Sequence, residues 1–147
     1  MYAVATVKQA KDYLNHIRTL GNRMDSRVEQ LAHLKSAMGL NAVQMKQEGV
    51  ESGNRSNNRD SAYLKIIELE EELGDEIINM QRQKLEACRM IEKLDDLMQM
   101  KVLKERYLQN KSWQDIANSI DRSYRHTLKV HGWALVEFAS MNHIDLN

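Results

Sequence analysis

The residues with the clearest chemical potential gather near the C-terminus. Arg122, Arg125 and Lys129 are cationic, and Tyr124 and His126 can take part in hydrogen bonds. Such side chains bind phosphate oxygens through charge and read base edges in the major groove through hydrogen bonds. We therefore predict a site for double-stranded DNA in which Lys111, Ser112 and Gln114 position the backbone, and Arg122, Ser123, Tyr124, Arg125, His126 and Lys129 begin the helix that enters the groove.

Other chemistries have no matching pattern in the sequence. The five histidines and Cys88 lack metal-ligand spacing, and no stretch resembles a catalytic constellation or a phosphate-binding loop. A single cysteine excludes an internal disulfide and fits a reducing compartment. No apolar run reaches the roughly 18 residues that a membrane span needs. We expect a cytoplasmic protein that is not an enzyme, holds no cofactor or metal and does not contact the membrane.

Short capped helices are the elements that must position this site. Ser112 and Ser123 are predicted N-caps, and Asp115 follows Ser112 at nearly the spacing of a capping box. Between the two helices Asp121 takes the turn position, and Ala117 is the small residue that a close helix crossing requires. We expect an apolar wedge from Ile116, Ile120, Val130 and either Leu128 or Thr127, with the second helix continuing through Trp133, Ala134, Leu135 and Phe138.

The segment VLKERYLQNKSWQDIANSIDRSYRHTLKVHGWAL, residues 102–135, resembles region 4 of sigma factors. The matching positions are Arg106-Tyr107, Asp115-Ile116-Ala117, Ser123 and Ala134-Leu135. The segment departs from the pattern at Asp121, which replaces the usual glycine, and at Arg122, which replaces an apolar residue. Asp tolerates the left-handed conformation that the turn needs. The resemblance implies a helix-turn-helix domain over residues 97–147 and allows contact with RNA polymerase.

The preceding residues carry two apolar stripes at helical spacing. Residues 6–38 follow a heptad pattern with Gly21 as its weak point, where we expect a bend or a close helix crossing. A second helix is predicted from Asp60 or Ser61, with a stripe from Ile66 to Met98. Residues 39–60, rich in Gly, Ser and Asn, are predicted to form a flexible loop. The expected fold is all-α: a long antiparallel coiled coil in residues 1–96, followed by the helix-turn-helix.

The whole chain, in its architecture, resembles small phage regulators of the RinA and ArpU type. This resemblance implies a sequence-specific DNA-binding transcription regulator encoded by a phage or prophage, of the late-gene activator type. The net charge of the chain is zero, yet residues 101–147 carry seven Lys or Arg against five Asp or Glu. The stripes predict a homodimer, because two narrow helices cannot enclose each other. A small terminase subunit and a coiled-coil adaptor remain alternatives.

Overall fold

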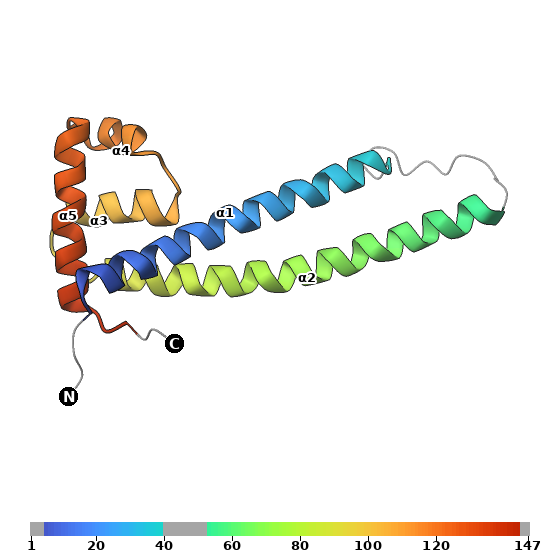
Figure 1. Cartoon of the computed structure of the whole chain (residues 1–147), viewed down its shortest axis with the longest axis horizontal. Coiled ribbons are helices and arrows are strands. Elements are labelled where there is room, and N and C mark those ends of the chain that lie inside the picture. Colours follow the sequence, from blue (N-terminus) through green and yellow to red (C-terminus); the bar gives the residue numbers. More distant parts are fainter. Residues whose placement is uncertain (1–4, 40–52, 145–147) are drawn as a thin grey trace. The chain divides into compact units, whose positions relative to one another are not determined.

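The computed structural model describes residues 5–39 and 53–144, and every regular element in this part of the chain is a helix. This confirms the all-α class. No helix within these ranges is long and apolar enough to cross a membrane. In chain order the elements are α1 (Val7–Ala37), α2 (Gly53–Ile91), α3 (Leu97–Leu103), a five-residue π-helix η1 (Lys104–Leu108), α4 (Trp113–Ile120) and α5 (Tyr124–Met141). Figure 1 labels the five α-helices.

Helix α1 agrees with the prediction from the heptad pattern. It begins with a reciprocal cap that the sequence analysis did not identify: the Gln9 backbone N–H donates to Thr6 Oγ1 at 3.1 Å, and the Thr6 N–H donates to Gln9 Oε1 at 2.9 Å. Gly21 lies inside the helix, and a Cβ there would come within 3.1 Å of Asn110 Nδ2. Gly21 therefore marks a close contact with a loop side chain, whereas the bend or close helix crossing expected there stays a prediction.

Helix α2 differs from the prediction at both ends. It begins at Gly53, so the last eight residues of the predicted 39–60 loop are helical, while residues 40–52 lie outside the described part. Ser and Asn in this stretch remove the apolar periodicity but cost a helix far less than Pro does. At the other end α2 stops at Ile91, a turn follows, and Asp96 caps α3 by accepting from the Gln99 N–H at 2.9 Å. The apolar stripe used for the prediction continues to Met98, past the end of the helix. An apolar pattern reflects which residues are buried, and Leu94 is buried although it lies in the turn.

The chain divides into two compact units, each of which is described by itself. The unit Arg23–Asn79 consists of parts of α1 and α2 joined by the ion pairs Arg27–Glu76 and Lys35–Glu70. As α1 advances, its partners on α2 move back along the sequence, so the two helices are antiparallel here. Supercoiling of this pair stays a prediction. Val28 belongs to the heptad pattern of residues 6–38 but is 46% exposed, so the pairing of α1 with α2 does not bury the whole stripe.

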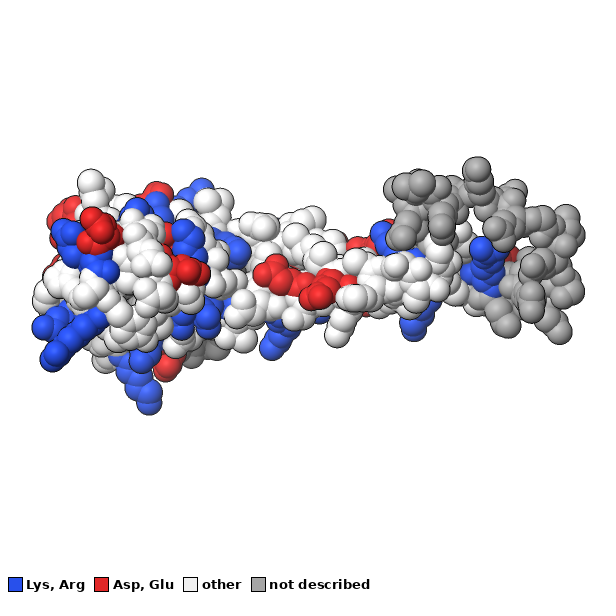
Figure 2. Space-filling view, turned by 90° about the horizontal axis from the view of Figure 1, so that it is seen from above, with Lys and Arg blue, Asp and Glu red and all other residues white. Residues whose placement is uncertain are grey.

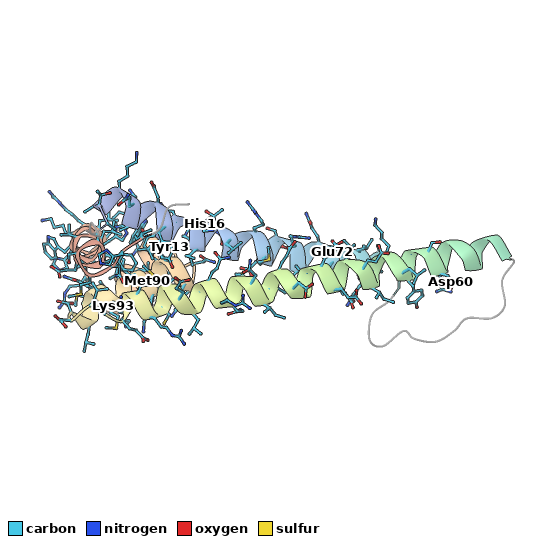
Figure 3. All side chains as sticks on the ribbon, turned by 90° about the horizontal axis from the view of Figure 1, so that it is seen from below. Tyr13, His16, Asp60, Glu72, Met90 and Lys93 are labelled. Carbon is cyan, nitrogen blue, oxygen red and sulfur yellow. The ribbon has the colours of Figure 1, made fainter. Side chains whose placement is uncertain are left out.

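The second unit combines Met1–Asn22 with Met80–Asn147. Its main core brings Ala10 and Leu14 of α1 and Ile91 of α2 against the C-terminal helices. Figure 3 shows Tyr13 near the N-terminal end of α1 and Met90 near the C-terminal end of α2. The Tyr13 ring stacks on Phe138 with 6.3 Å between centroids, and Asn142 Nδ2 donates to the Met90 carbonyl at 3.3 Å. The predicted domain boundary between residues 96 and 97 stays a prediction, and this unit extends beyond it.

Candidate nucleic-acid interface

The connection between α4 and α5 is built by the residues predicted for it. Ser112 Oγ accepts from the Asp115 N–H at 3.2 Å, and Ser123 Oγ accepts from the His126 N–H at 3.0 Å, so both serines are N-caps as predicted. Asp121 adopts the left-handed conformation with φ 55° and ψ 50°. The Arg122 N–H donates to the Ala117 carbonyl at 3.1 Å, which satisfies a carbonyl at the end of α4.

The apolar wedge beneath this connection is a second core cluster. It contains Val102, Ile116, Ile120 and Val130, and Ala117 is buried beside it. The prediction left open whether Thr127 or Leu128 contributes to this wedge. Thr127 is fully buried, whereas Leu128 is 38% exposed. The Thr127 hydroxyl donates to the Ser123 carbonyl at 2.9 Å, so its burial leaves this donor satisfied.

The first two turns of α5 present the predicted groove-facing residues to solvent. Tyr124 is 49% exposed, and Arg122, Arg125 and Lys129 are exposed. His126 is half-buried, and its ring is nearly perpendicular to that of Trp133, with 6.1 Å between the ring centroids. Figure 2 shows Lys and Arg side chains projecting from the part of the molecule that carries the C-terminal helices.

Lys111, Ser112 and Gln114, the residues predicted to position the DNA backbone, make hydrogen bonds or ion pairs within the protein. Lys111 Nζ binds Glu105 Oε1 at 2.6 Å, and the Glu105 side chain is only 5% exposed. Gln114 is exposed and donates to Asn118 Oδ1 at 3.2 Å. Ser112 is exposed while its hydroxyl oxygen caps α4. The charge of Lys111 is therefore partly neutralised by a buried carboxylate, and the exposed cations lie at the start of α5.

A buried aromatic network behind the interface was not predicted. The Tyr107 hydroxyl and His131 Nε2 lie 2.7 Å apart, and the Trp113 ring meets His131 edge-on at 4.5 Å. Burial, with smaller contributions from Lys11 and Arg106, lowers the pKa of His131 from 6.5 to about 4. The network joins η1, the start of α4 and the middle of α5, so it fixes the two interface helices to each other.

Arg106 adds to this network from the π-helix. Its guanidinium lies 4.4 Å from the Trp113 ring centroid, and Nη1 donates to the Lys111 carbonyl at 3.1 Å. Burial is the main cause that lowers the pKa of Arg106. From the sequence, Arg106 and Tyr107 were only matching positions of the resemblance to sigma region 4, and a π-helix has no sequence signal that would have identified this role.

Two apolar residues of α5 are exposed. The helix continues through Trp133 as predicted, but this side chain is 53% exposed, as is that of Val136. Ala134 and Leu135 are buried as expected. A large apolar residue type predicts burial on average, whereas its place around the helix axis decides the outcome.

Within residues 5–39 and 53–144 no group of three or more His, Cys, Asp or Glu side chains could hold a metal ion. The fold and this surface define an all-α protein with two consecutive serine-capped helices, α4 and α5, and with exposed cations at the start of α5. The chain belongs to the family described as protein of unknown function DUF1492, whose model matches residues 39–135. The matched segment contains every predicted site residue. No curated protein and no solved structure matches the chain.

Proposed function

We propose that this chain is a sequence-specific DNA-binding transcription regulator encoded by a phage or prophage, and that α4 and α5 act as its helix-turn-helix. One observation carries the proposal. From Arg122 to Val136 the chain has no acidic residue, and the three cations of this stretch, Arg122, Arg125 and Lys129, are all exposed. A helix that enters the major groove needs such a surface, because repulsion between carboxylates and phosphates would oppose binding.

The geometry around the turn supports this role. In a helix-turn-helix the second helix contacts base edges through its N-terminal residues. Here Tyr124 and Arg125 occupy the first turn of α5, and Lys129 lies one turn after Arg125. The left-handed Asp121 replaces the glycine of the sigma region 4 pattern, which agrees with the proposed resemblance. Contact with RNA polymerase and a cytoplasmic location belong to the same proposal.

We further propose that the protein acts as a homodimer assembled through the long helices. Leu64, Ile67 and Ile78 of α2 are between 49% and 62% exposed, which leaves apolar surface for a partner. Two recognition helices joined in this way would bind half-sites about 34 Å apart, so the DNA site should be an inverted repeat. Native mass spectrometry tests the assembly: a dimer supports the regulator, and a ring of eight or more copies would favour a small terminase subunit.

DNA binding is tested by anisotropy titrations with a duplex selected by the full-length protein from a random-sequence pool. The double variant Arg125→Ala/Lys129→Ala should weaken binding and flatten the log–log salt dependence by about one for each phosphate that is no longer bound. The matched control Lys65→Ala/Arg82→Ala removes two exposed cations from α2 and should leave both quantities unchanged. Equal affinity and salt dependence for the wild type and the α5 double variant would refute the proposed interface.

A further inference from the structure

The exposed face of α5 continues beyond the cations of the proposed interface. Arg125, Lys129, Gly132, Trp133 and Val136 follow one another at spacings of three and four residues, apart from the adjacent pair Gly132-Trp133, and all are exposed. Residues at such spacings share one face of a helix. The side chains that bury α5, among them Val130, Ala134 and Phe138, lie on its other side. The cationic and the apolar parts of this face therefore point in the same direction.

Gly132 is not explained by packing within the described chain. A Cβ added at this position would meet no atom within 4 Å, so no described neighbour requires a glycine. Glycine in a helix interior is less stable than alanine, and its usual advantage is a close approach of the backbone to another molecule. Trp133 next to it is 53% exposed although it is the largest apolar side chain of this helix. Both observations point to a partner that covers this part of α5.

We propose that this partner is the DNA itself, and that Gly132 and Trp133 extend the interface formed by Arg125 and Lys129. In this arrangement Trp133 packs against a deoxyribose or a thymine methyl group, and Gly132 allows the helix backbone to approach the phosphates. The inference rests on the proposed function. At 1.5 Å per residue Trp133 lies about 12 Å along the axis from Arg125, which is close to the width of the major groove.

Charge favours DNA over a second copy of this helix as the partner of this face. The stretch from Arg122 to Val136 carries cations and no carboxylate, and Glu137 follows only after Val136. The His126 and Trp133 rings are nearly perpendicular, with 6.1 Å between centroids, so the indole lies next to a residue of the proposed groove-facing set. A second copy of this helix would bring the same cations against each other, whereas a phosphate backbone is attracted by all of them.

The first test uses tryptophan fluorescence, because the chain has only two tryptophans. In a Trp113→Phe background Trp133 is the sole indole, and titration with the selected duplex should change its emission with the same midpoint as anisotropy. Where that variant is unfolded by circular dichroism, Trp133→Phe serves instead, and it should abolish the emission change seen in the wild type. An indole signal that does not respond to DNA, or one that follows protein concentration without DNA, would overturn the proposal.

The second test separates folding from binding. Gly132→Ala should raise Tm by about 4 °C, the size expected for one glycine replaced in a helix, and should weaken binding of the duplex by about tenfold. Gly74→Ala is the matched control: it also has open space at Cβ, so it should raise Tm similarly and leave affinity unchanged. Trp133→Ala should weaken binding by about tenfold, the size expected for a single interaction in the groove. Wild-type affinity in both α5 variants would overturn this inference alone, whereas a wild-type protein that binds no duplex would overturn the proposed function with it.

Discussion

The buried His131 should make the stability of the fold sensitive to mild acid. Its ring is 8% exposed and hydrogen-bonds with Tyr107, and burial lowers its pKa to about 4. In the unfolded chain the imidazole has its ordinary pKa of 6.5. The unfolded state therefore binds more protons between these two values, and the free energy of unfolding must fall as the pH falls through this range.

The two pKa values give the size of the effect. The stability contributed by neutral His131 is fully present above pH 6.5 and lost progressively down to about pH 4. The complete loss is roughly 3 kcal/mol, and by pH 5 about 2 kcal/mol of it has disappeared. That is a large part of the 5–15 kcal/mol by which domains are usually stable, so it should be visible without further destabilisation.

Urea unfolding followed by circular dichroism at pH 7 and pH 5 measures this loss. The wild type should lose about 2 kcal/mol more than His131→Gln, which cannot gain a proton in this range. His16→Gln replaces an exposed histidine of α1 and should follow the wild type. Parallel pH dependence in the wild type and His131→Gln would show that His131 is not buried against Tyr107 as described.

Four substitutions test the parts that hold the proposed interface. Ala117→Leu should destabilise the protein by about 1–3 kcal/mol through overpacking, and a melt at the wild-type temperature would refute the proposed helix crossing. Ser123→Ala removes the cap of α5 and should cost about 1 kcal/mol in urea unfolding; no loss would mean that the cap is dispensable. Lys111→Ala leaves Glu105 buried without its partner and should cost about 2 kcal/mol, and adding Glu105→Gln should recover most of it in a double-mutant cycle. Additive costs in that cycle would contradict the ion pair.

The caps and the turn between α4 and α5 could be predicted from the sequence because they follow local rules. A serine before a helix satisfies its unpaired N–H groups whatever the rest of the chain does, so Ser112 and Ser123 were identifiable. Asp121 was predictable for the same reason, since few residue types adopt a positive φ. Helix α1 followed from its heptad pattern, because no proline interrupts it.

The features that were missed depend on contacts between distant residues. Thr127 and Leu128 were equivalent from spacing alone, and the rotation of α5 on the core decided that Thr127 is buried. The same rotation exposes Trp133, although its residue type suggested a core position. Lys111 was assigned to DNA on its charge, and only the π-helix, which buries Glu105, reveals its ion pair. Periodicity likewise continued past Ile91 because Leu94 is buried without being helical.

The position of α5 depends on more of the chain than the predicted helix-turn-helix segment. Its buried residues Leu135 and Phe138 share one core with Ala10 and Leu14 of α1 and with Ile91 of α2. The model of the family covers residues 39–135 and so omits the α1 part of this core. A helix presented to a partner must be held rigidly from behind, because the cost of ordering it would otherwise reduce affinity. The N-terminal turns of α1 are therefore part of the core that holds α5 from the side opposite to its exposed cations, and the proposed interface depends on them.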